Sequence, residues 1–137
     1  MILADTSAWV EYDRSTGSPV DLRITTLVEN DPAGLAVTEP VIMEVVIGAR
    51  SDQREVELRR LLLRHPTLSF DSGVDFDRAA MIYRRCRSRG ITPRGIVDCM
   101  IAAVAWRNGA ALLAHDVDLY RVAQVVGLDV DPASLAV

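Results

Sequence analysis

Five short apolar runs, separated by longer stretches of helical periodicity, place the tightest limit on how this chain can fold. The runs lie at residues 1–4, 35–37, 68–70, 111–114 and 128–130. Runs this short, without a polar face, are typical of strands buried on both sides, and helices between successive strands favour a parallel sheet. The sequence therefore predicts an α/β fold in three layers, a parallel sheet flanked by helices. We expect one domain over residues 1–137, without a linker or an internal repeat.

The helical stretches carry recognisable termini. Apolar residues recur at helical spacing over residues 76–86, and we expect the Asp71-Ser72 pair to cap the start of this helix and Gly90 to follow its end. The next helix is expected to open at Thr92-Pro93 and to close at Asn108-Gly109. Further helices are predicted at residues 22–29 and 56–63, and a small cap on the sheet at residues 132–137.

The charge pattern separates a basic middle from two acidic ends. All 15 basic residues are arginine, which excludes chemistry that needs a lysine, such as a Walker-A phosphate loop or a Schiff base. The net charge is −4, yet residues 49–94 carry eleven arginines against six acids. Five of these arginines have no acid among them: Arg84, Arg85, Arg87, Arg89 and Arg94. This run predicts either a solvated helix face or a surface that contacts phosphates.

The sequence also bears on the compartment in which the protein works. No apolar run reaches about 18 residues without a charge, and the first residues lack the basic start of a signal peptide. Cys86 and Cys99 form no CxxC motif. We therefore expect a cytoplasmic protein that does not associate with a membrane.

Four acids stand where acids are unusual. Asp98 is the only charge in the apolar stretch 96–106, and Glu44 is the only charge in 40–49. Asp5 and Asp116 each follow an apolar strand run directly. Because the carboxyl ends of parallel strands meet at one edge of a sheet, we expect the four carboxylates to converge there. Like charges brought together must bind protons or cations, and all-oxygen ligands select Mg²⁺ or Mn²⁺.

Each acid also has an ordinary structural interpretation. Asp5 and Asp116 could cap helices, Glu44 could lie at an exposed helix edge, and Asp98 could pair with a buried arginine. These interpretations need four unrelated explanations, whereas one metal site needs a single explanation. The sequence therefore favours the metal site. His115, beside Asp116, is expected to be structural.

Taken in order, these residues resemble the PIN-domain ribonucleases, and in particular the VapC-type toxins of bacterial toxin–antitoxin pairs. The resemblance covers nearly the whole chain. It lies in residues 2–9 (ILADTSAW), Glu44, residues 95–103 (GIVDCMIAA) and residues 111–119 (ALLAHDVDL). The family's acidic positions are matched by Asp5, Glu44, Asp98 and Asp116, a frequent additional acid by Asp118, and a supporting hydroxyl by Thr6.

This resemblance implies a five-stranded parallel sheet and cleavage of RNA that depends on Mg²⁺ or Mn²⁺. In such a site, Asp5 and Asp98 are expected to bind the ion directly. Glu44 and Asp116 would complete the shell or orient a water molecule, and Thr6 would orient a carboxylate. Arg94 is expected to hold a phosphate next to the bond that is cut.

The family further implies partners: an RNA substrate, a cognate small antitoxin, a second copy in a homodimer, and promoter DNA reached only through the antitoxin. An alternative is an inactive PIN-like binding module whose acidic pocket accepts an arginine from a partner protein. A phosphatase of the haloacid-dehalogenase type, with Asp5 as nucleophile, is disfavoured because Ser7 stands where that mechanism needs a second acid. RNA cleavage that stops when a chelator is added distinguishes the enzyme from the binding module.

Overall fold

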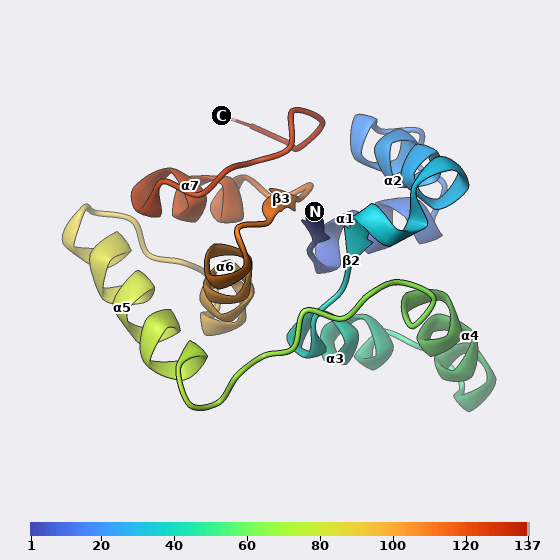
Figure 1. Ribbon diagram of the computed structural model, residues 1–137, viewed down its shortest axis with the longest axis horizontal. Helices are drawn as coiled ribbons and strands as arrows, with labels where there is room; N and C mark the ends of the chain where they lie inside the picture. Colours follow the sequence, from blue (N-terminus) through green and yellow to red (C-terminus); the bar gives the residue numbers. More distant parts are fainter. Residues whose placement is uncertain (137) are drawn as a thin grey trace.

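The computed structural model describes residues 1–136, in which short strands alternate with longer helices (Figure 1). The strands are β1 (Ile2–Ala4), β2 (Leu35–Ala36) and β3 (Ala111–Leu113). The helices are α1 (Thr6–Asp13), α2 (Pro19–Asn30), α3 (Glu39–Ile47), α4 (Asp52–Leu62), α5 (Asp75–Ser88), α6 (Ile96–Asn108) and α7 (Val117–Val126). A 3₁₀ turn, η1 (Pro32–Gly34), leads into β2. The helices expected at residues 22–29 and 56–63 lie in α2 and α4.

The sheet is parallel throughout, in the order β2-β1-β3. Its register pairs Leu3 with Ala36 on one side and with Leu112 on the other, and all three side chains are buried. Burial on both faces explains why these strands are continuous apolar runs and do not alternate with polar residues. The predicted α/β class and the parallel sheet flanked by helices are therefore confirmed.

The expectation of five strands is wrong, because each of the two outer runs contributes only a single parallel bridge within residues 1–136. These bridges join Val37 to Thr67 beside β2, and Leu112 to Val130 beside β3. Beyond the first bridge, the N–H of Phe70 donates to the Glu39 carboxylate at 3.0 Å and so does not extend a ladder. Beyond the second, the Ala133 N–H donates to Asp131 Oδ1 at 3.0 Å and the Ala114 N–H donates to Ser134 Oγ at 3.1 Å, so neither extends a ladder.

The chain after the second bridge follows the end of β3, as expected of a small cap. The Leu135 N–H donates to the Ala114 carbonyl at 2.9 Å, and the Ser134 hydroxyl donates to the Leu112 carbonyl at 3.3 Å. Val137, the last residue of the predicted cap, lies outside the described residues.

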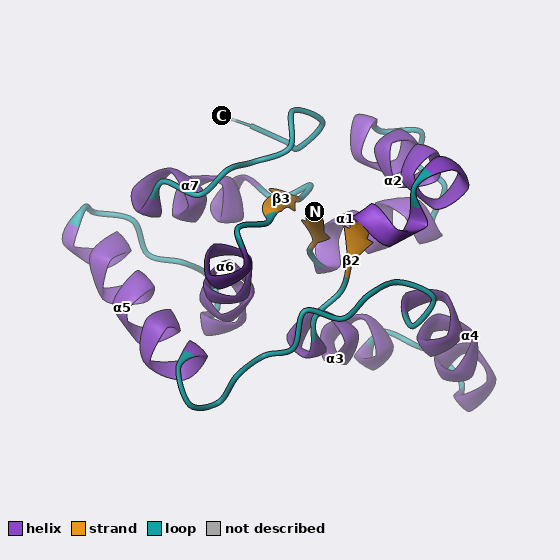
Figure 2. Ribbon diagram, viewed as in Figure 1, coloured by secondary structure: helices purple, strands orange, loops and turns teal. Residues whose placement is uncertain are grey.

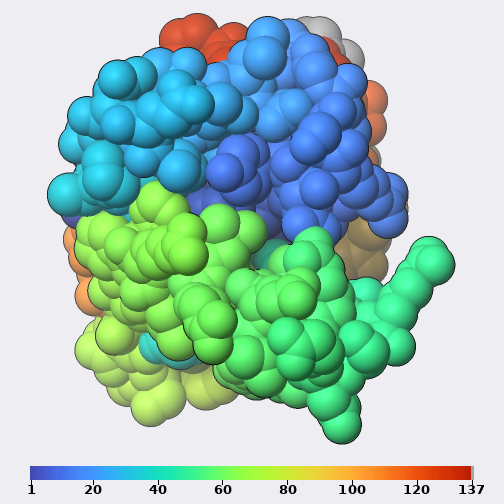
Figure 3. Space-filling view, turned by 90° about the vertical axis from the view of Figure 1, so that its right-hand side faces the viewer, coloured from blue at the N-terminus to red at the C-terminus, as the bar shows by residue number. Residues whose placement is uncertain are grey.

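The helices cover both faces of the sheet. Figure 2 shows the strands at the centre, with α5, α6 and α7 on one side and α1, α2 and α4 on the other. Helix α3 contacts both α1 and α6. On the side that carries α4, the surface is formed by the N-terminal helices above and by α4 and the segment after it below (Figure 3). Helices α4 and α5 therefore lie at opposite ends of the molecule (Figure 1).

Helix α6 is central, as its apolar sequence predicts, and residues 101–105 are all buried. Its predicted start is wrong: the helix begins at Ile96, because Gly95 is extended (φ −148°, ψ 149°) and interrupts any helical path from Thr92-Pro93. Its predicted end is confirmed, since Gly109 adopts the left-handed conformation that terminates helices (φ 64°).

Helix α5 begins later than predicted and is not capped by Asp71-Ser72. The carbonyl of Asp71 accepts from the N–H groups of Val74 and Asp75, so these residues form the turn that precedes the helix. The end near Gly90 is confirmed, with φ +75° at that residue just beyond Ser88.

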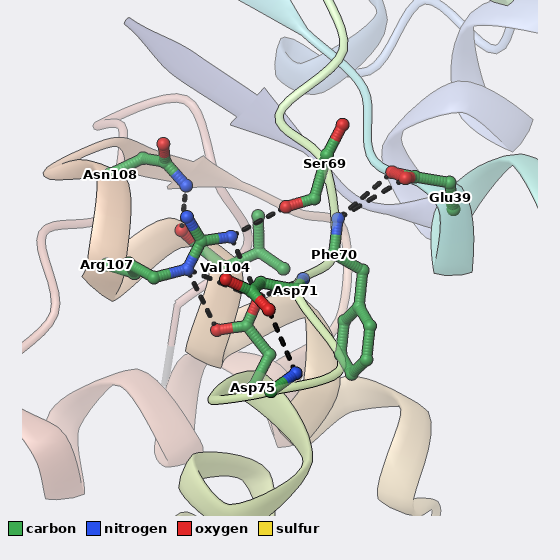
Figure 4. A network of polar contacts seen from close by, with 9 residues as sticks. Glu39, Ser69, Phe70, Asp71, Asp75, Val104, Arg107 and Asn108 are labelled. Atoms are coloured by element: carbon green, nitrogen blue, oxygen red, sulfur yellow. Dashed lines mark hydrogen bonds and ion pairs between the residues drawn. The ribbon is translucent and has the colours of Figure 1, made fainter.

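A buried ion pair locks α5 to α6. The Asp75 side chain is fully buried and accepts from Arg107 Nη2 at 2.8 Å and from Nε at 3.0 Å (Figure 4). Arg107 also donates to the Ser69 carbonyl at 2.6 Å. Burial alone would raise the pKa of Asp75, but the hydrogen bonds from Arg107 and from the Asp71 N–H hold that pKa below its usual range. The Asp75–Arg107 ion pair thus holds α5, α6 and the loop before α5 together.

Candidate active site

Two of the predicted acids lie where neighbouring strands end at the same edge of the sheet. Asp5 follows β1 and Asp116 follows the end of β3 by three residues. The Asp5 N–H donates to the Leu113 carbonyl at 3.0 Å, and the His115 N–H donates to Ser7 Oγ at 2.8 Å. These bonds tie the two strand ends together, as the parallel topology requires.

Asp5 is the most deeply buried of these acids, with 2% of its surface exposed. Its Oδ1 accepts from Ser7 Oγ at 2.7 Å and from the Ala8 N–H at 2.9 Å, so it caps α1 as the structural interpretation predicted. Burial raises the pKa of Asp5 to about 7, and the nearby charges of Asp98 and Asp116 add to this rise against the two hydrogen bonds. A carboxylate held in this way has a strong affinity for a proton or a cation.

Thr6, the residue after Asp5, connects Glu44 to this end of the sheet by a hydrogen bond. Thr6 Oγ1 donates to Glu44 Oε1 at 2.6 Å, which connects the first turn of α1 to α3. Glu44 is half-buried, and its side chain lies close enough to Asp98 to raise the pKa of that residue. Through this hydrogen bond, the Thr6 hydroxyl can orient the Glu44 carboxylate.

Asp98 lies in the first turn of α6 and is half-buried. Its pKa is raised to about 6, chiefly by burial and then by the charges of Asp116 and Glu44, while the charge of Arg94 opposes the rise. Among the described residues no hydrogen-bond donor contacts its carboxylate, and no arginine forms an ion pair with it. The structure therefore gives no support to the interpretation of Asp98 as a structural partner of a buried arginine.

Asp116 and Asp118 share an arginine. Arg94 Nη2 lies 3.0 Å from Asp116 Oδ1, and Arg94 Nε forms an ion pair with Asp118 Oδ2. Asp116 Oδ1 also accepts from the Asp118 N–H at 2.8 Å, so Asp116 caps α7. Asp118 is further approached by Arg121 at 3.7 Å. Arg94, predicted to hold a phosphate, thus lies at the site, with 72% of its side chain exposed and its guanidinium directed at two acids.

Asp5, Glu44, Asp98 and Asp116 share one property, and Asp118 differs from them in its arginine neighbours. Each keeps at least one carboxylate oxygen that accepts no hydrogen bond from residues 1–136. These oxygens are Oδ2 of Asp5, Oε2 of Glu44, both oxygens of Asp98 and Oδ2 of Asp116. In Asp118, by contrast, each oxygen lies near an arginine. As the side chains stand in this part of the chain, no three His, Cys, Asp or Glu residues are gathered closely enough to hold a metal ion.

Two residues of this region were not singled out for the roles that they have in the structure. Ser7 entered only as the residue that stands where a phosphatase needs a second acid, although its hydroxyl connects Asp5 to the backbone of His115. The Asp-Thr-Ser order after a strand was the available signal. His115 lies 3.5 Å from Glu11, a contact between two segments that the sequence alone could not pair.

Comparisons with known proteins place this arrangement in a family. The model of the PIN domain matches residues 2–125. The chain belongs to the PIN-domain family. Two curated relatives are each 44% identical over 128 residues, which make up 93% of this chain and 96% of theirs. They are the VapC ribonuclease Mb1587 of Mycobacterium bovis and the ribonuclease VapC11 of Mycobacterium tuberculosis.

Solved structures agree with this PIN-domain assignment at the level of the fold. The DNA-bound VapBC from Salmonella typhimurium aligns with a TM-score of 0.73 at 18% identity, over 95% of this chain and 96% of that one. The expected membership in the VapC group of PIN domains is therefore confirmed.

None of the helices in the described part of this PIN domain has the length and apolar character needed to span a membrane.

Proposed function

We propose that this PIN-domain protein is a VapC-type toxin, an endoribonuclease that hydrolyses RNA phosphodiester bonds with Mg²⁺ or Mn²⁺. One observation carries the proposal. Four carboxylates at one edge of the sheet each leave an oxygen without a donor, while the chain itself positions the other oxygen of Asp5, Glu44 and Asp116. The 44% identity to VapC ribonucleases supports the choice of RNA as substrate.

The donor set fits a hard divalent cation. All candidate ligands are carboxylate oxygens, and the pKa values of Asp5 and Asp98 are raised by burial and by neighbouring negative charges. This is the chemistry of a site that binds protons until a cation replaces them. In this proposal Asp5 and Asp98 are direct ligands, and Glu44 and Asp116 complete the shell.

When bound, the ion would neutralise charge on the scissile phosphate and activate a water molecule for attack. The residues of the chain prepare this chemistry. Hydrogen bonds from Ser7 and Ala8 orient Asp5, and a hydrogen bond from Thr6 orients Glu44. Arg94, which contacts Asp116, would leave that acid to contact the phosphate. The guanidinium of an arginine matches the oxygens of a phosphate.

The test is RNA cleavage by purified protein that has been freed of any partner. Cleavage should require Mg²⁺ or Mn²⁺, stop with EDTA, and be lost in Asp98→Asn. Asp129→Asn is the matched control, because this exposed acid forms no ion pair or side-chain hydrogen bond within residues 1–136. RNA that stays intact at high protein concentration with either ion would contradict the proposal.

One observation favours the second candidate, a binding module that accepts an arginine. Asp116 and Asp118 already accept Arg94, so these two acids bind a guanidinium in the structure. In that case a partner arginine should bind in the presence of EDTA, and no metal should support turnover.

Partners follow from the same proposal. We expect inhibition by a small cognate antitoxin, which would contact promoter DNA for the pair, and we expect a homodimer. Coexpression with the product of the adjacent reading frame tests the first expectation, and sedimentation velocity of the isolated chain tests the second.

A further inference from the structure

We propose that the outer face of α5, together with the turn into α6, holds the RNA backbone that leads to the acidic site. This inference rests on the proposed ribonuclease function and adds the path of the substrate. We call this surface the α5 arginine face and define it by Arg84, Arg85, Arg87 and Arg89. All four side chains are exposed.

The orientation of α5 puts these arginines outside. Ala79, Ile82 and Cys86 are buried and form the inner face of the helix, which packs on α6. The arginines occupy the remaining positions of the last turns and the residue after the helix. Beside them, Arg84 and Arg85 line an open hollow of about 480 Å³ along the outer face of the helix, which Asp77 also lines without forming an ion pair to either arginine within residues 1–136.

The arginines of this face differ from most other arginines in having no acid to neutralise them. Within the described chain, Arg23, Arg59 and Arg107 each form an ion pair with an acid. None of the four arginines on the α5 face forms one. Within residues 1–136, the one hydrogen bond from their guanidinium groups runs from Arg89 Nη1 to the Val125 carbonyl at 3.4 Å, and the Arg87 guanidinium lies 6.0 Å from the centre of the Tyr83 ring.

The helix dipole explains only part of this pattern. Positive side chains in the last turn of a helix are stabilising, and the effect falls off within about one turn. Arg84 lies a full turn before Ser88, and one or two arginines would satisfy the terminal carbonyls. Four unpaired guanidinium groups near the end of one helix, in a protein of net charge −4, therefore favour an anionic ligand on this face.

The α5 arginine face leads directly to the acids. The turn that follows it ends at Arg94, which contacts Asp116 at the start of α7, while Arg89 contacts Val125 near the end of α7. At about 1.5 Å per residue, the ten-residue helix α7 separates these two arginines by on the order of 15 Å. Guanidinium groups at the two ends of this path suit two phosphates of one strand that are not adjacent.

An RNA strand fits this surface better than an acidic protein does, because the same ligand must continue into a site that acts on phosphodiesters. The test uses the triple variant Arg84→Gln/Arg85→Gln/Arg87→Gln. Its matched control is Arg50→Gln/Arg60→Gln/Arg64→Gln, in which three exposed arginines without ion pairs lie at the opposite end of the molecule, around α4 (Figure 1). Both variants lose the same charge.

Fluorescence anisotropy with a short labelled single-stranded RNA in EDTA measures binding without cleavage. We expect the α5 variant to bind about tenfold more weakly or worse. Its slope of log affinity against log salt should shrink by about 2, since each lost phosphate contact removes about 0.7. The control variant should match the wild-type chain in both quantities.

The outcomes separate this inference from the proposed function. Equal binding by the two triple variants would overturn the α5 arginine face, even if the protein cleaves RNA. Weaker binding by the α5 variant alone would support the face, even if no metal supports cleavage. Unchanged RNA binding with loss of antitoxin binding would assign the face to a protein partner and would also overturn the inference.

Discussion

Thr6 Oγ1 lies 2.6 Å from Glu44 Oε1, and this hydrogen bond joins α1 to α3 between residues that are 38 positions apart in the sequence. Thr6→Val removes the donor and keeps the shape of the side chain. We expect a loss of about 1 kcal/mol in unfolding free energy. RNA cleavage should fall by about tenfold or more, because Glu44 loses its fixed orientation.

The control for this prediction is Thr26→Val, which removes an exposed hydroxyl bonded to the Leu22 carbonyl within α2. That variant should keep full cleavage, and Thr6→Ser should restore most of it. Cleavage by Thr6→Val at the rate of the control would show that the bond is only structural.

Asp98→Asn tests whether the acids repel each other without metal. Removing one negative charge from a like-charged group should leave the unfolding free energy in EDTA unchanged or raise it. A structural ion pair would instead lose about 3–5 kcal/mol. Denaturant unfolding measures this quantity, and the rise in melting temperature with Mn²⁺ should be smaller in the variant than in Asp129→Asn.

The stability of the metal-free protein should fall as the pH rises from about 5 to 7. Asp5 has a pKa of about 7 in the folded chain and 3.8 as its ordinary value, so the native state holds a proton that the unfolded state has released. The contribution is fully present below the unfolded pKa and is lost as the pH passes the folded one, about 2–3 kcal/mol over this window. Urea unfolding at several pH values should show this decline, and Asp5→Asn should reduce it to the smaller decline that the raised pKa of Asp98 contributes.

Arg94→Gln should strengthen binding of Mn²⁺. The guanidinium contacts Asp116 and lowers the pKa of Asp98, so it competes with a cation for the same charges. Removing about 1 kcal/mol of repulsion corresponds to about fivefold tighter binding. Electron paramagnetic resonance of free Mn²⁺ during titration measures the affinity directly. Weaker Mn²⁺ binding by the variant would show that Arg94 organises the acids and does not compete for them.

Asp75→Ala tests the buried ion pair between Asp75 of α5 and Arg107 of α6. It leaves the Arg107 charge without its buried partner, and we expect a loss of about 3–5 kcal/mol in unfolding free energy. Asp77→Ala, an exposed acid on the same helix without an ion pair in the described chain, should change stability by less than 1 kcal/mol. Equal stability of the two variants would contradict the structural role of the pair.

The sequence by itself determined the class of fold and which acids to examine. Apolar runs of three or four residues specify buried parallel strands, because burial on both faces leaves no place for polar side chains. Asp98 and Glu44 stood out for the same reason, as single charges in apolar helices. These features are local, so they can be recognised without knowing which segments meet.

Only the tertiary structure decided contacts between distant segments. The two outer runs became single bridges because Phe70 bonds to the Glu39 side chain and Ala133 bonds to the Asp131 side chain. Arg94 lies at the acids because the turn before α6 passes the start of α7. These contacts depend on which hydrogen bonds and ion pairs form once distant segments meet, and a local sequence pattern does not contain that information.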